Sequence, residues 1–97
     1  MRAAWYERCG PAREVIQVGE LPTPEAGPEE VRIRLHASGV NPSDVKKRAG
    51  LRSPLQEKRV IPHSDGAGVI DQVGAGIDPA RLAERVWVYN GQWGRPF

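Results

Sequence analysis

The side chains best suited to chemistry fall in two short segments, residues 41–44 and 63–65. Their amide, hydroxyl, carboxylate and imidazole groups can exchange hydrogen bonds or move protons. No pair of His or Cys residues has the spacing of a zinc motif, and Cys9 is the only cysteine. The sequence therefore predicts neither an internal disulfide nor a zinc site.

A glycine-rich stretch at residues 66–71 is the other candidate for binding chemistry. It begins like the G-x-G-x-x-G phosphate loop, but Asp71 occupies the position of the third glycine. The stretch is also predicted to be a strand, whereas a bound pyrophosphate needs the N-terminus of a following helix. We therefore expect these glycines to allow close backbone approach within a β-sheet, and not to bind a nucleotide.

The first chemical segment begins a predicted helix over residues 41–50. Asn41 is a good N-cap, a proline occupies the first helical position, and Gly50 suits the left-handed residue after the last turn. Asp44 complements the positive end of the helix dipole and is expected to pair with Arg48, four residues later. This helix would place the Asn41 amide beside free backbone N–H groups.

Short strands, separated by glycine and proline, make up the remainder of the predicted fold. Eleven glycines and nine prolines are typical of a barrel or sandwich of short strands. The strongest signal is the alternation of Val31, Ile33, Leu35 and Ala37 with polar residues, which predicts one inward face. The proline-rich segment 21–28 should lie extended on the surface. The predicted strands span residues 1–6, 14–19, 30–37, 67–73 and 85–89.

Length and charge narrow the classes of function. With 97 residues the chain is one small domain, too short for both a nucleotide-binding βαβ domain and a substrate domain. Its net charge of +2 comes from cations spread among acidic residues, which argues against nucleic-acid binding. No apolar run approaches the roughly 20 residues of a membrane span, and we find no secretory signal. We therefore expect a cytoplasmic protein that binds neither nucleic acid nor membrane.

Four motifs lie in order along nearly the whole chain: LPTP with PEEVRIR (residues 21–24 and 28–34), GVNPSD (39–44), IPHSDGAGVI (61–70) and RVW (85–87). In this order they resemble the medium-chain dehydrogenase/reductase superfamily, in its quinone oxidoreductase branch, also called zeta-crystallin-like. The resemblance implies a truncated N-terminal GroES-like domain over residues 1–97. Such a domain is mainly β with a short helix and forms a partly open β-barrel, here incomplete, while the Rossmann domain is absent.

The departures from the family pattern concern its metal. Zinc alcohol dehydrogenases have a ligand cysteine where this chain has Asn41, and His-Glu where it has Ser64 and Asp65. The nearby His63 is one residue out of register, and such a slip turns a strand side chain to the other face. An amide and a hydroxyl cannot replace thiolate and imidazole as zinc ligands. The resemblance therefore implies an enzyme that works without zinc.

The same resemblance implies that the complete enzyme passes a hydride from NADPH to a quinone or an enone. Such a substrate is already electrophilic, so hydrogen-bond donors can hold the developing charge without a Lewis acid. The implied site residues are Asn41 and Ser64 for catalysis, Asn41 and Asp44 for cofactor binding, and Arg48, His63 and Asp65 in the substrate cleft.

The 97-residue chain by itself is expected to bind no NADPH and to have no hydride-transfer activity, because the cofactor domain is missing. A missing barrel strand would leave an unpaired edge, so self-association is expected as well. The alternative function is a free-standing small β-barrel that recognises a protein partner through its polar loops. A reading frame that continues into G-x-G-x-x-G after a strand would decide for the enzyme.

Overall fold

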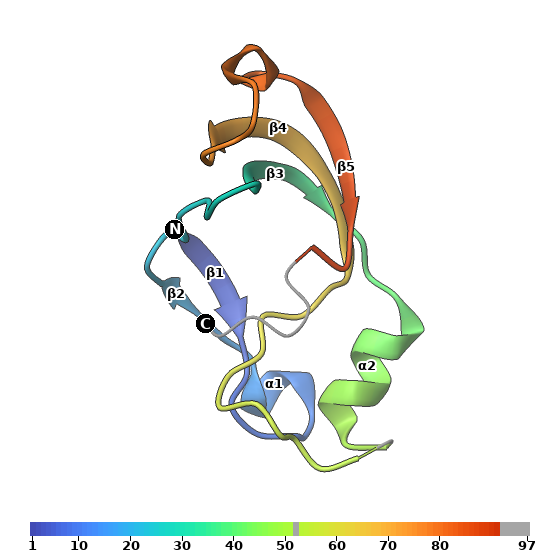
Figure 1. The fold of residues 1–97 in the computed structure, drawn as a ribbon. Coiled ribbons are helices and arrows are strands. Elements are labelled where there is room, and N and C mark those ends of the chain that lie inside the picture. The colour runs from blue at the N-terminus through green and yellow to red at the C-terminus, as the bar shows by residue number, and fades with distance from the viewer. Residues whose placement is uncertain (52, 92–97) are drawn as a thin grey trace.

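The computed structural model describes residues 1–51 and 53–91. The fold is mainly β with short helices, as predicted, and within these residues its two antiparallel sheets stay open and do not close into a barrel. Figure 1 shows the three-stranded sheet β3-β4-β5 above the two-stranded sheet β1-β2 and the helices. In chain order the elements are β1 (Arg2–Trp5), α1 (Ala12–Val15), β2 (Gln17–Glu20), β3 (Val31–Ser38), α2 (Pro42–Ala49), β4 (Asp65–Val73), the 3-10 helix η1 (Pro79–Arg81) and β5 (Arg85–Tyr89).

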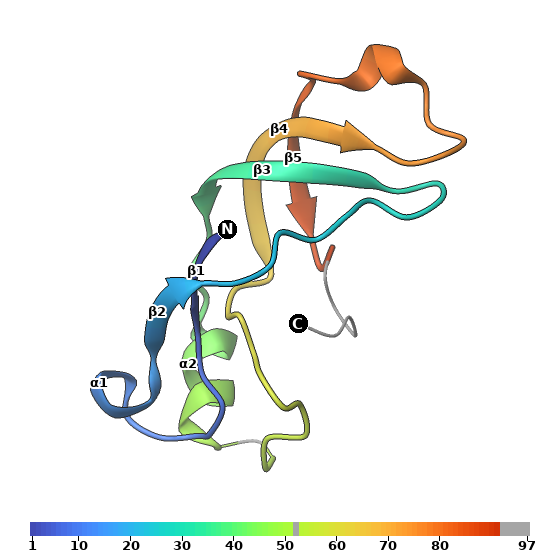
Figure 2. The same ribbon diagram turned by 90° about the vertical axis from the view of Figure 1, so that its left-hand side faces the viewer.

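The central strand β4 organises the region around both chemical segments. It pairs with β3 on one side and β5 on the other, and it curves strongly in the view of Figure 2. Ser38 at the end of β3 pairs with Gly66 near the start of β4. Because α2 begins only four residues after Ser38, its N-terminus is held beside the start of β4.

Helix α2 forms where the local sequence rules predict it. Asn41 caps the helix in an extended conformation (φ −119°, ψ 155°), and the Asp44 carboxylate accepts a hydrogen bond from the Asn41 backbone N–H at 2.8 Å. Gly50 ends the helix with φ 78°, and its N–H donates to the carbonyl groups of Lys46 and Lys47. The positive φ is the reason for glycine at this position.

Two strand predictions need correction. The strand predicted at residues 14–19 is wrong in its first half, because α1 takes up Ala12–Val15 and β2 begins only at Gln17. Val15 is 3% exposed, so tertiary packing favours a helical turn there over the extended propensity of the sequence. In β3 the predicted inward face fails at Leu35, which is 53% exposed, because register shifts at Arg32/Ile33 and Leu35/Ala37 interrupt the alternation.

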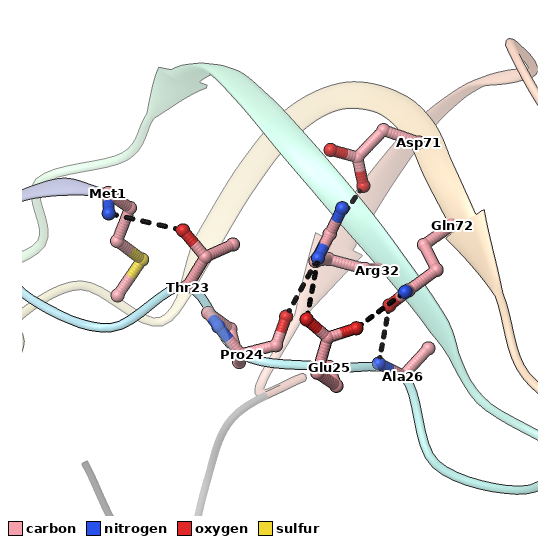
Figure 3. Close-up of polar contacts among 8 residues, drawn as sticks. All are labelled: Met1, Thr23, Pro24, Glu25, Ala26, Arg32, Asp71 and Gln72. Atoms are coloured by element: carbon pink, nitrogen blue, oxygen red, sulfur yellow. Dashed lines mark hydrogen bonds and ion pairs between the residues drawn. The ribbon is translucent and has the colours of Figure 1, made fainter.

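The proline-rich segment is fastened to the three-stranded sheet by polar contacts (Figure 3). Arg32 of β3 donates from Nε to Asp71 at 2.8 Å and from a terminal nitrogen to the Pro24 carbonyl at 3.1 Å. Gln72 of β4 accepts from the Ala26 N–H at 2.7 Å. These bonds give an extended segment, whose prolines cannot donate to a ladder, a fixed place on the surface.

The core is small, as expected for a chain of this length. Tyr6, Val15 and Ile70 are each exposed by no more than 3%. Tyr6 forms an isolated bridge with Val60, and its burial, followed by the nearby acidic groups of Cys9, Glu57 and Asp44, raises its pKa to about 12. In the part of the chain that the structure describes, no helix combines the length and the hydropathy of a membrane span.

Candidate functional site

The structure brings Asn41 and Asp65 into direct contact. The Nδ2 atom of Asn41, at the N-cap of α2, donates to Asp65 Oδ1, on the first residue of β4, at 2.5 Å. A carboxylate is only an acceptor, so this bond fixes which end of the Asn41 amide faces Asp65. It uses one of the two N–H bonds on Nδ2 and leaves the second available.

Gly39 makes room for this contact. Its N–H donates to the Asp65 carbonyl at 2.8 Å, so the two backbones lie side by side. A Cβ atom at position 39 would overlap Asp65 Oδ2 and would lie 2.7 Å from its Cγ. Glycine at position 39 therefore allows the Asp65 carboxylate to turn toward Asn41.

Asp44 holds the two chemical segments together. One of its carboxylate oxygens accepts from the Asn41 N–H, and the other accepts from the backbone N–H of His63 at 3.1 Å. The expected ion pair with Arg48 is wrong: Arg48 instead donates to the Gly10 carbonyl at 2.5 Å. Both carboxylate oxygens of Asp44 are therefore engaged by backbone groups near the N-terminus of α2, while Arg48 serves the opposite end of the helix.

His63 and Ser64 lie half-buried in the connection that leads into β4. His63 has φ 85°, and its Nδ1 lies 2.6 Å from Ser38 Oγ. The backbone carbonyl of Ser64 accepts from the Asn90 N–H at 2.6 Å. The contact with Ser38 is one that the sequence analysis missed, and no spacing signal could have shown it, because the two residues are 25 positions apart.

A surface hollow of about 350 Å³ opens beside the Asn41–Asp65 contact. Asp65 lines it, whereas Arg48 and His63, the other residues predicted for the substrate cleft, do not. Trp87 forms part of its wall and is 79% exposed, which is unusual for a side chain of this size. The remaining lining residues are Ala37, Ser38, Gly39, Gly66, Ala67 and Val88.

The donor set of the site is suited to hydrogen bonding. Within residues 1–51 and 53–91, no group of three or more His, Cys, Asp and Glu side chains could hold a metal ion. What the site offers is an oriented amide, two carboxylates, a serine–histidine pair and the N-terminus of a helix. Such groups can orient a polar ligand and can stabilise negative charge on an oxygen atom.

Comparison with known proteins relates this arrangement to a family. The family model for the alcohol dehydrogenase GroES-like domain matches residues 27–95. The human synaptic vesicle membrane protein VAT-1 homolog is 39% identical over 72 residues, which are 72% of this chain and 18% of that protein. The rat quinone oxidoreductase is 33% identical over 86 residues, covering 88% of this chain and 26% of that protein. Alcohol dehydrogenases also match.

The fold agrees with the sequence matches. The crystal structure of Escherichia coli quinone oxidoreductase, complexed with NADPH, superposes with a TM-score of 0.77 at 24% identity. The superposition covers 90% of this chain and 26% of that one. The chain thus spans about a quarter or less of the length of these relatives. The resemblance inferred from the sequence is confirmed, and the chain belongs to the alcohol dehydrogenase GroES-like domain family, within the medium-chain dehydrogenase/reductase superfamily and close to its quinone oxidoreductases.

Proposed function

We propose that this chain is the GroES-like part of an NADPH-dependent oxidoreductase that reduces a quinone or an enone without zinc. The observation that carries the proposal is the Asn41–Asp65 hydrogen bond of 2.5 Å. It lies where the family resemblance would place a metal-binding cysteine and the His-Glu pair. The polar groups at this place are therefore bonded to one another in a network of their own.

Zinc fits this set of side chains poorly. The Asn41 amide directs its nitrogen to Asp65, and an amide nitrogen has no lone pair to offer a metal. The ring of His63 is turned to Ser38 at Nδ1, and Ser64 offers a hydroxyl in place of an imidazole. Structural and catalytic zinc sites take thiolate, imidazole or carboxylate ligands, usually three or four together. We therefore derive no catalytic step through a metal.

NADPH, when bound by the complete enzyme, supplies the hydride. The part that this chain contributes is a fixed set of donors beside the acceptor. Asn41 retains one amide N–H, and the helix end beside it carries partial positive charge. Both stabilise the negative oxygen that forms when a hydride adds to a quinone or an enone. The similarity to quinone oxidoreductases supports this substrate class.

The remaining predicted residues receive graded roles in the proposal. Asp65 orients the Asn41 amide, and Asp44 positions Asn41 and His63 through their backbone N–H groups. Ser64 is proposed as a second donor to the substrate, and Asp44 contacts the cofactor only through the residues that it positions. Arg48, bonded to Gly10, is assigned to the support of α2.

The test uses the complete polypeptide that carries this domain. Oxidation of NADPH is followed at 340 nm with 1,4-naphthoquinone as acceptor, before and after dialysis against a zinc chelator. We expect turnover that the chelator leaves unchanged, and a loss of about 10²-fold in kcat for Asn41→Ala, the usual cost of removing an oxyanion donor. Ser43→Ala, an exposed neighbour in the first turn of α2, is the control.

The opposite result is equally clear. Oxidation of a simple alcohol that disappears with the chelator and returns with added zinc would overturn the proposal. Equal activity of Asn41→Ala and Ser43→Ala would remove Asn41 from the mechanism. For the 97-residue chain alone we expect no consumption of NADPH.

A further inference from the structure

Strand β5 has one open edge, and the hydrogen-bond pattern shows which of its residues face it. β5 pairs with β4, and no other described strand lies on its outer side. The bonds Ile70 N–H to Glu84 carbonyl (3.0 Å) and Asn90 N–H to Ser64 carbonyl (2.6 Å) fix the phase of the ladder. Hydrogen-bonded positions alternate along an antiparallel strand. The backbone groups that point outward are therefore those of Arg85, Trp87 and Tyr89.

The other edge of the same sheet, formed by β3, is protected in ways that β5 is not. Two register shifts interrupt β3, charged Arg32 and Arg34 lie along it, and Arg32 holds the proline-rich segment against the sheet. Proteins commonly use such bulges, charges and prolines to prevent edge-to-edge pairing. β5 pairs with β4 without a register shift, contains no proline or lysine, and exposes Trp87 by 79% and Tyr89 by 65%.

We propose that the open edge of β5 binds β5 of a second copy of this chain, antiparallel and with Trp87 opposite Trp87. The sequence Arg85-Val86-Trp87-Val88-Tyr89 is self-complementary in this register. Arg85 of each copy lies opposite Tyr89 of the other, where a guanidinium can contact the aromatic face, and Val86 lies opposite Val88. No like charges are opposed.

The backbone groups agree with this register. The outward groups belong to the odd-numbered residues, and pairing about Trp87 places odd residues opposite odd residues. A shift by one residue would oppose outward groups to groups already bonded to β4, and a shift by two would leave part of the strand unpaired. In the proposed register each outward N–H of Arg85, Trp87 and Tyr89 finds a carbonyl on the partner.

The two-fold geometry also predicts where association stops. Pairing β5 with β5 uses the same edge on both copies, so the contact is isologous and closes at two chains. The remaining outer edge of the enlarged sheet is β3, with its charges and register shifts. The inference thus predicts a dimer with a six-stranded sheet, and not an open fibre.

Hydrogen exchange measured residue by residue by NMR distinguishes this mode from others. The 97-residue chain is studied between 10 μM and 1 mM, and its mass is followed by sedimentation velocity. We expect a monomer–dimer equilibrium in which the amides of Arg85, Trp87 and Tyr89 gain protection as concentration rises. The amides of Val86 and Val88, bonded to β4, should be protected at every concentration.

Two matched variants test the register. Trp87→Lys places two ammonium groups opposite each other and should raise the dissociation constant of the dimer at least about tenfold. Leu51→Lys adds the same charge at an apolar residue that is equally exposed, 75% against 79%, and should leave dimerisation unchanged. Trp87→Pro removes one outward N–H without removing a bond to β4, and should also weaken the dimer.

Three results would overturn the inference. The first is a monomer at all concentrations up to 1 mM. The second is association without the alternating protection in β5, or with equal weakening by Trp87→Lys and Leu51→Lys, since another surface would then be in contact. The third is protection of the outward amides that is independent of concentration, because the edge would then be covered by the chain itself.

Discussion

Replacement of Gly39 by alanine tests the steric basis of the candidate site. A Cβ atom there would overlap Asp65 Oδ2, so the carboxylate must move away and the Asn41–Asp65 bond must break. Overpacking of this kind costs about 1–3 kcal/mol. A lost hydrogen bond to a charged group adds about 1–2 kcal/mol at a half-buried position. We expect Gly39→Ala to lower the free energy of unfolding by about 2–4 kcal/mol.

The assay is urea unfolding followed by circular dichroism, with Gly27→Ala as the matched control. A Cβ atom on Gly27 would lie 3.2 Å from Glu30 Oε2, the far end of a flexible side chain that can move at little cost. That variant should stay within about 0.5 kcal/mol of the parent, as is usual for surface substitutions. The side-chain amide resonances of Asn41 provide a local readout, because they should shift in Gly39→Ala and stay unchanged in Gly27→Ala.

A double-mutant cycle with Asp65→Ala decides whether the clash is the cause. Without the carboxylate the new methyl group has nothing to displace, so Gly39→Ala should cost at least about 1 kcal/mol less in the Asp65→Ala background. Additive effects of the two substitutions would refute the reasoning. So would a Gly39→Ala variant as stable as the parent.

Three further predictions concern single contacts. Asp44→Ala, which removes the partner of the Asn41 and His63 N–H groups, should cost about 1–2 kcal/mol in urea unfolding, while Ser43→Ala should cost little. Arg32→Lys cannot reach Asp71 and the Pro24 carbonyl together, so the Ala26 amide should exchange faster than in the parent, and Arg34→Lys serves as the control. Because burial raises the pKa of Tyr6 to about 12, the folded state retains this proton more strongly than the unfolded chain does; stability should therefore fall as pH rises from about 10 through 12, and the absorbance titration at 295 nm of a Tyr89→Phe variant should show that single late transition.

Local rules predicted the helix at residues 41–50 well, because its signals are carried within one stretch of sequence. Asn41, Asp44 and Gly50 each act on the helix that contains them, and the structure uses all three in that way. The strand at 14–19 failed because a short element has too few local interactions to resist tertiary packing, here the burial of Val15. The same holds for Leu35, whose orientation depends on register shifts against β4.

The family and the mainly β class could be inferred from the order of four motifs, and the comparisons confirm them. The types of the site residues were also evident from the sequence. Their partners were not. The ion pair expected between Asp44 and Arg48 rested on helical spacing alone, and both side chains bond instead to backbone groups from other parts of the chain.

The sequence by itself determined where α2 begins and ends, which residue types occupy the metal-ligand positions of related dehydrogenases, and which strand has a self-complementary pattern. Only the tertiary structure decided that Asn41 donates to Asp65, that His63 turns to Ser38, and that Gly39 must lack a side chain. The bonded side chains are 24 and 25 positions apart, and no local energy links them. They meet because the pairing of Ser38 with Gly66 holds the end of β3 beside the start of β4, with α2 following at once.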